Sequence, residues 1–107
     1  MQDIQTAKDL VLACQEALEA APADAAADTL ARFTAPDYLW RGMHPFDRIT
    51  GAEAVGSRFW DGLRGSLTHI QRRMDVFFAG ANSLDGGASV WVVSMGHLMG
   101  LFDAPWL

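Results

Sequence analysis

Hydrophobic residues recur at helical spacing over the first twenty positions of the chain. One apolar stripe is formed by Ile4, Ala7, Val11, Cys14 and Leu18. This spacing predicts an amphipathic helix over residues 3–20, because positions three and four apart lie on the same side of an α-helix. Asp3 suits the N-cap position, where a side-chain oxygen accepts a backbone N–H. Pro22 should end the helix, since proline has no backbone N–H to donate.

Two shorter elements are expected after this break. Asp24 can cap a second helix that runs to about Phe33. Residues 38–41 (YLWR) predict a short strand, and residues 42–50, with their glycine and proline, predict a loop.

The clearest helix start in the chain is T-G-A-E at residues 50–53. Thr50 and Glu53 fit a capping box, in which each side chain accepts a hydrogen bond from the backbone N–H of the other residue. Apolar residues follow at helical spacing up to Gly65, so this segment predicts a third helix.

From Leu67 onward the apolar period changes to two, which is the period of a strand. One face of this strand should hold Ile70, Arg72, Met74, Val76 and Phe78. Asp85-Gly86 predicts a hairpin turn, and a second strand should run from about Ser89 to Leu101. Alternate positions of that second strand place five residues on a common face: Trp91, Val93, Met95, His97 and Met99.

Helices followed by an antiparallel sheet predict one α+β domain over residues 1–107. So few strands would leave a long exposed edge, and exposed edges are normally paired, covered or blunted. We therefore expect a domain that is truncated at its C-terminal end or that borrows strands from a partner. Trp106 would then lie at an interface or at the edge of the fragment.

Composition narrows the classes of partner. Half of the 107 residues are hydrophobic, which is enough to form a core. Residues 1–37 hold two basic and seven acidic residues, and the remainder holds six of each, so the net charge of −5 belongs to the N-terminal segment. The chain has no basic stripe to neutralise phosphates, which argues against a nucleic-acid partner.

Location is suggested by what the sequence lacks. The N-terminus does not resemble a secretory signal, and no apolar run is long enough to span a bilayer. Cys14 is the only cysteine, so the chain cannot form an internal disulfide. These features favour a reducing, cytoplasmic environment without a membrane partner.

Two histidines are candidates for acid–base chemistry, because the imidazole can take and give a proton near neutral pH. His44 lies in the predicted loop, and Asp47, three residues later, can orient its ring. Alternatively, Asp47 caps the following turn and His44 packs at the surface. His97 is the second candidate if its face of the strand lines a pocket; otherwise it is a core histidine with one hydrogen bond.

Arg72 and Arg73 are neighbours on a strand, so their side chains point to opposite faces. A buried Arg72 needs a carboxylate partner, for which the sequence offers Asp47, Glu53 or Asp103. We favour such a structural salt bridge for Arg72. The alternative is that Arg72 anchors a carboxylate or enolate oxygen of a substrate.

The tryptophans and other large apolar side chains have two interpretations that the sequence does not separate. They form the core, or they form the walls of a pocket for a polycyclic ligand. The residues concerned are Trp40, Phe59, Trp60, Trp91 and Met95.

Five short motifs occur in order along the chain. They are W-R-G-x-H-P-F at 40–46, T-G-A-E-A at 50–54, F-W-x-x-L at 59–63, R-R-x-D at 72–75 and W-V-x-S-M-G-H at 91–97. Together they resemble the SnoaL-like polyketide cyclase group, which belongs to the nuclear transport factor 2-like superfamily. The resemblance covers residues 5–107.

The resemblance implies a cone-shaped fold, in which N-terminal helices pack on a curved antiparallel sheet around a mostly apolar pocket. It also implies a homodimer formed through the outer face of the sheet. The implied activity is acid–base chemistry next to a carbonyl of an apolar or polycyclic small molecule, without metal or organic cofactor. In such an enzyme His44 or His97 would act as base or acid, Asp47 would orient the ring, and Arg72 or Trp40 would position the oxygen.

The chain departs from this family pattern at its end. Members of the group continue through two more long strands that carry an acid–base aspartate, and nothing in this sequence matches that aspartate. The alternative function is therefore a non-catalytic ligand-binding or dimerisation module of the same fold.

Overall fold

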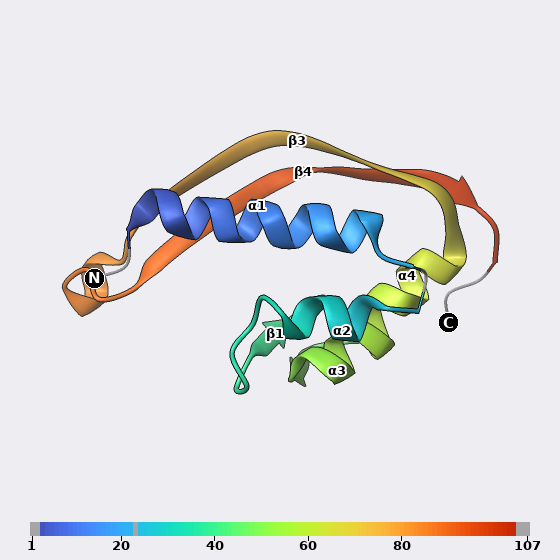
Figure 1. The fold of residues 1–107 in the computed structure, drawn as a ribbon, viewed down its shortest axis with the longest axis horizontal. Helices are drawn as coiled ribbons and strands as arrows, with labels where there is room; N and C mark the ends of the chain where they lie inside the picture. The colour runs from blue at the N-terminus through green and yellow to red at the C-terminus, as the bar shows by residue number, and fades with distance from the viewer. Residues whose placement is uncertain (1–2, 23, 105–107) are drawn as a thin grey trace.

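A long antiparallel β-hairpin arches over the N-terminal helix and forms one layer of the structure (Figure 1). The computed structural model describes residues 3–22 and 24–104. Shorter helices and a small two-stranded sheet lie on the other side of the N-terminal helix (Figure 1). The fold is therefore mixed α+β with antiparallel sheets, as the sequence predicts.

The first helix, α1 (Ile4–Ala20), confirms the prediction from the apolar stripe. The Asp3 carboxylate accepts a hydrogen bond from the Thr6 backbone N–H at 3.0 Å, so the predicted N-cap is confirmed too. The helix buries Ala7 and Leu18, and it ends before Pro22.

The second helix, α2 (Ala26–Ala31), starts later than predicted. Its N-cap is Ala25, which has no side chain able to accept a hydrogen bond, so the prediction that Asp24 caps this helix is wrong. The backbone N–H of Ala25 donates to the Pro22 carbonyl at 3.1 Å, and this turn leaves Asp24 one position ahead of the cap.

The predicted strand at residues 38–41 is confirmed as β1 (Leu39–Arg41), but the predicted loop at 42–50 is only partly a loop. Its last three residues form β2 (Arg48–Thr50), which pairs antiparallel with β1. The pairing buries Ile49 against the core, which is a reason for the chain to continue as a strand here.

The capping box predicted at Thr50 is absent. Thr50 pairs with Leu39 at the end of the small sheet, and the helix that follows begins after Gly51, which makes no side-chain cap. Gly51 has a φ of 88°, a left-handed conformation that glycine adopts without a steric penalty. The change of direction therefore falls on Gly51 and leaves Thr50 to the strand.

The predicted third helix is a continuous helical run with a change of pitch. It consists of α3 (Ala52–Val55), a π-helical turn η1 (Gly56–Trp60) and α4 (Asp61–Ser66). Gly56 packs against α2 so closely that an added Cβ would lie 2.4 Å from the Ala27 backbone nitrogen. The core between these elements contains Leu18, Ala26, Leu30, Ile49 and Val55.

The hairpin consists of β3 (Leu67–Ala81) and β4 (Val90–Phe102), as predicted, joined through a short 3-10 turn η2 (Ser83–Asp85). Within the described residues each strand is paired along one edge only. The register shifts twice, between Thr68 and Gln71 and between Met74 and Val76, and each shift places one extra residue in β3. Such bulges bend a strand, which fits the arch seen in Figure 1.

The second bulge corrects the predicted alternation in β3. Val76 and Phe78 do not share a face with Met74, because one extra residue reverses the side on which every later side chain lies. Phe77 faces α1 instead, and the Lys8 ammonium lies 5.3 Å from the centre of its ring. We call the α1-facing side of the hairpin the concave face and the opposite side the convex face.

No helix in the described part of the chain combines the length and the apolar character that crossing a membrane requires.

Candidate functional site

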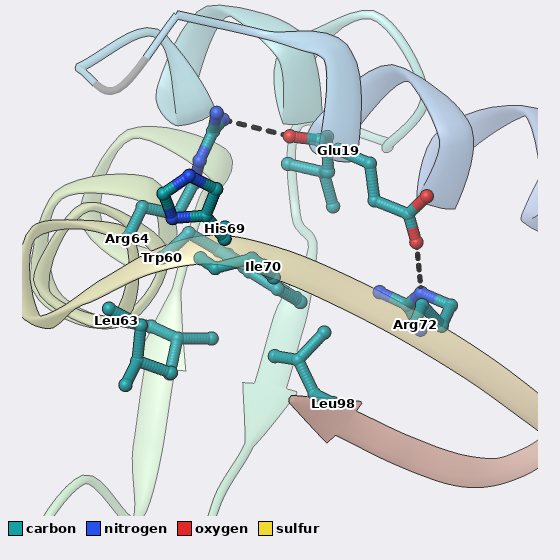
Figure 2. A pocket seen from close by; sticks show the side chains of 10 residues that line it. Glu19, Trp60, Leu63, Arg64, His69, Ile70, Arg72 and Leu98 are labelled. Carbon is teal, nitrogen blue, oxygen red and sulfur yellow. Dashed lines mark hydrogen bonds and ion pairs between the residues drawn. The ribbon is translucent and has the colours of Figure 1, made fainter. Parts of the chain in front are cut away.

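Two adjoining cavities lie between α1, the concave face of the hairpin and the helical run that ends in α4. Their volumes are about 200 Å³ and about 540 Å³, and both are lined by Trp60, Arg72 and Leu98. We refer to the two cavities together as the groove. Figure 2 shows the smaller one, with Glu19 from α1, Arg72 from β3 and Leu98 from β4 around it.

The π-helical turn supplies the aromatic wall of the groove. Phe59 and Trp60 both line the larger cavity, and their ring centroids are 5.1 Å apart in an edge-to-face arrangement. Trp40 and Phe46 support Phe59 from behind, with centroids 4.6 and 5.4 Å from that ring. Turns of this wide pitch are rare and often occur at functional sites. Met43, from the turn between β1 and β2, completes this side of the cavity.

Arg72 and Glu19 form an ion pair across the groove. The Arg72 Nε lies 2.5 Å from the Glu19 Oε1, and the two side chains keep 22% and 38% of their exposure (Figure 2). A carboxylate partner for Arg72 was expected, but it is Glu19 rather than Asp47, Glu53 or Asp103. The pair links the last turn of α1 to the middle of β3.

Gln15 forms a second link, one helical turn earlier on α1. Its amide Nε2 donates to the Ser94 Oγ at 3.3 Å, and both residues line the larger cavity. The amide oxygen of Gln15 is buried and accepts no hydrogen bond in the described part of the chain. A buried acceptor without a donor is costly, so this atom marks a place where a ligand donor would be stabilised.

Arg64 lines the smaller cavity but serves the end of α1. Its guanidinium donates to the backbone carbonyls of Leu18, at 2.8 Å, of Pro22, at 3.3 Å, and of Ala21. These carbonyls lie at the end of a helix, where the helix itself provides no donors. Arg64 therefore has a structural role, whereas the two Nη groups of Arg72 form no hydrogen bond within the described residues.

His44 and Asp47 lie in the tight turn that joins β1 to β2, and both are exposed. The Gly42 N–H donates to the Asp47 carbonyl at 2.8 Å, and the His44-Pro45 peptide is cis. Neither residue lines the two cavities of the groove. The structure therefore does not bring them together with His97.

His97 lies on β4 at the edge of the larger cavity, and its side chain shares the convex face with Met95 and Met99. Two charged groups of β3 lie beside its ring. Its Nδ1 lies 2.9 Å from the Asp75 Oδ2 and 2.8 Å from an Arg73 Nη. One nitrogen cannot serve both neighbours at once: protonated Nδ1 donates to Asp75, and bare Nδ1 accepts from Arg73. His97 can therefore exchange partners as its proton moves.

The large apolar residues proposed as pocket walls lie in different parts of the structure. Trp60 lines the groove, whereas Trp40 packs behind it. Trp91 and Met95 lie on the convex face and are 65% and 60% exposed. Trp106 lies outside the described residues.

The residues that sequence reasoning missed are Gln15, Glu19 and Ser94. Gln15 and Glu19 flank the apolar stripe of α1 four positions apart, which is a detectable sign that two polar side chains border a packed face. Ser94 shows no such sign, because its role depends on how α1 crosses the hairpin.

Burial perturbs two groups that pack against the hydrophobic core. It raises the pKa of the Cys14 thiol, and the positive charge of Arg72 lowers that pKa to a smaller extent. Burial also raises the pKa of the Tyr38 hydroxyl, and Cys14 adds to this increase. Among the residues that the structure describes, no three histidine, cysteine or acidic side chains gather in a way that could hold a metal ion.

No protein-family model, no curated protein and no solved structure matches this chain. Its function must therefore be inferred from the groove itself.

Proposed function

We propose that the chain binds a small apolar or polycyclic molecule in the groove, as a domain of the nuclear transport factor 2-like type. The observation that carries this proposal is the groove: adjoining cavities with an aromatic wall and a few convergent polar groups, Arg72, Ser94 and Gln15. Ligand sites typically combine apolar walls with a small number of placed polar groups. The position of α1 within the concave face of a bent hairpin supports the cone-shaped fold that the motifs imply.

A flat neutral probe, 2-acetylnaphthalene, tests this proposal by NMR titration of the ¹⁵N-labelled chain. We expect shifts at Gln15, Trp60 and Ser94, with smaller changes on the convex face. Met43→Trp should fill the larger cavity and weaken binding, whereas the matched variant Met95→Trp, on the convex face, should bind as the unmodified chain does. Shifts confined to the convex face would overturn the proposal.

A second candidate function is acid–base catalysis next to a carbonyl, which His97 supports through its pairing with Asp75. When Nδ1 donates to Asp75, the other ring nitrogen, Nε2, is bare and can accept a proton. Nε2 would take a proton from the carbon beside a ketone, leave an enolate, and return the proton to the same or another carbon. No external oxidant or reductant is needed.

Deuterium exchange tests this second candidate. The methyl protons of 2-acetylnaphthalene, dissolved in D₂O with the protein, should be replaced by deuterium, and ¹H NMR follows the loss of their signal. His97→Gln should slow exchange about 100-fold, the lower end of typical general-base effects. His44→Gln, in the turn outside the groove, is the matched control. If His44→Gln slowed exchange about 100-fold and His97→Gln did not slow it, the base would lie in the turn between β1 and β2 instead.

We also propose that the chain forms a homodimer through the convex face. The motifs imply this arrangement, and the exposed apolar side chains of that face support it: Val76, Phe78, Trp91, Met95 and Met99. Groups of exposed apolar side chains often mark a protein interface. Sedimentation equilibrium should give twice the mass of one chain. For Trp91→Lys the measured mass should fall to that of a single chain. An unmodified chain that sediments as a monomer would contradict the dimer.

A further inference from the structure

We infer that the groove selects an acidic ligand: a flat apolar body with a carboxylate that binds Arg72 and a hydroxyl that donates to Gln15. This inference rests on the proposed binding function and adds the chemical class of the ligand. It follows from the hydrogen-bonding capacity that the groove leaves unused.

Arg72 has more donors than its protein partner uses. A guanidinium carries five N–H groups, and within the described residues Arg72 forms its hydrogen bond through Nε alone, to Glu19. The two Nη groups remain for another acceptor, and Arg72 lines both cavities of the groove. Because the fork of Nη groups matches the two oxygens of a carboxylate, an acidic group is the ligand feature that fits here.

The Glu19 carboxylate competes with a ligand carboxylate for the Arg72 guanidinium. Its carboxylate occupies one side of the Arg72 guanidinium and is itself 38% exposed, so it can turn toward solvent when a ligand acid arrives. Removing the charge of Glu19 should therefore strengthen the binding of an acid. A purely structural ion pair gives no reason for such a gain.

Gln15 provides the complementary group. Its Nε2 donates to Ser94, and its amide oxygen is a buried acceptor without a donor, on a residue that lines the same cavity. A neutral hydroxyl is the simplest donor for this oxygen. An ammonium group would instead lie close to the positive charge of Arg72.

The spacing of the two anchors limits the ligand further. Gln15 and Glu19 are four residues apart on α1, which corresponds to a rise of about 6 Å. Since Glu19 holds Arg72, the acid and hydroxyl positions should be separated by roughly this distance. A hydroxyl and a carboxylate placed meta to one another on an aromatic ring approach it, and the ring would lie beside Trp60.

The test uses 4-hydroxy-2-naphthoic acid together with two altered probes. Its methyl ester keeps the hydroxyl and removes the charge, and 4-methoxy-2-naphthoic acid keeps the charge and removes the donor. Calorimetric titration should give an affinity for the hydroxy acid about tenfold higher than for either altered probe, the scale of one hydrogen bond to a charged or buried group.

Variants of Arg72 and Glu19 separate their role in ligand recognition from their role in stabilising the fold. Arg72→Gln should remove the preference for the acid over its ester, whereas Arg48→Gln, an exposed arginine on β2, should keep it. Glu19→Gln should raise the affinity for the acid several-fold and leave the ester unchanged. This variant keeps the inference testable if Arg72→Gln fails to fold.

The outcomes distinguish the two proposals. If the acid and the ester bind with equal affinity in the groove and Glu19→Gln changes neither, the acidic ligand class is wrong while the binding function stands. If none of these probes nor 2-acetylnaphthalene shifts the groove residues, the binding function is wrong, and the ligand class with it.

Discussion

The Arg72 guanidinium holds the Glu19 carboxylate at 2.5 Å and thereby joins α1 to β3 through two residues that are 53 positions apart in the sequence. The pair lies where the smaller and the larger cavity meet, so it both fastens α1 to the hairpin and borders the groove. Its contribution to stability can be separated from its contribution to binding.

A double-mutant cycle with Arg72→Gln and Glu19→Gln measures the stability part. We expect a coupling free energy of about 0.5–1 kcal/mol, because both groups keep contact with water and solvent screens the attraction. Urea unfolding of the four proteins at low salt gives this value, and added salt should reduce it. A coupling that is zero at low salt would mean that the pair contributes nothing to the fold.

The elements that the sequence predicts well are those whose causes are local. Asp3 and the apolar stripe lie within α1 itself, so the helix and its cap follow from neighbouring residues. The two long strands follow from their own period in the same way. The bulge between Met74 and Val76 does not, because a register shift depends on how β3 meets its partner. Its effect is to place Phe77 rather than Val76 and Phe78 toward α1.

The candidate site is harder to predict for the same physical reason. Glu19, Arg72 and Ser94 come from three elements, and only the packing of α1 on the hairpin brings them to the groove. His44 and Asp47, which are close in sequence, form a local pair of candidates but lie in the turn outside the groove. Sequence proximity identified residues with suitable chemistry, whereas the groove depends on long-range contacts.

The contact between Gly56 and α2 should tolerate no side chain. A Cβ at this position would lie 2.4 Å from the Ala27 backbone nitrogen and 2.5 Å from its Cα, and backbone atoms cannot rotate away. We expect Gly56→Ala to lower the free energy of unfolding by about 1–3 kcal/mol, the usual cost of overpacking. Chemical denaturation measures this loss.

Gly65→Ala provides the matched control for Gly56→Ala. Gly65 also lies in the helical run, but a Cβ there meets nothing within 4 Å. Alanine should stabilise this position by about 0.5 kcal/mol, because it loses less backbone freedom on folding than glycine does. Equal effects of the two substitutions would show that α2 does not restrict the side chain at position 56.

Gly96 should be equally restrictive within the hairpin. A Cβ on this residue would lie 2.0 Å from the Arg73 carbonyl oxygen of the paired strand. Gly96→Ala should therefore separate β3 and β4 locally, destabilise the protein by about 1–3 kcal/mol and perturb the neighbouring His97. Gly80→Ala, on β3 with nothing within 4 Å of its Cβ, should have little effect. NMR shifts of His97 test the local perturbation, and urea unfolding measures the loss of stability. A Gly96→Ala variant with unchanged stability and unchanged His97 shifts would refute the expectation.

Stability should decline in alkaline solution because of Cys14. Burial raises the pKa of its thiol above the ordinary value of 9.0, so between these two values the unfolded chain releases a proton that the folded chain retains. The folded state then binds more protons than the unfolded state, and the free energy of unfolding falls as pH rises. The stabilisation from the buried thiol is fully present below the ordinary pKa. It is lost as pH rises through the raised pKa of the folded chain. Urea unfolding at about pH 7 and about pH 9.5 should show the decline.

Two variants assign this decline to its source. Cys14→Ala should lose less stability over the same pH interval, since no thiol remains to titrate. Tyr38→Phe should behave as the unmodified chain near pH 9.5, because the pKa of Tyr38 is raised above its ordinary value of 10.0 and matters only at higher pH. A decline of the same size in Cys14→Ala would assign the alkaline sensitivity to another group. A decline that disappears only in Tyr38→Phe would mean that the tyrosine, rather than the thiol, ionises first on unfolding.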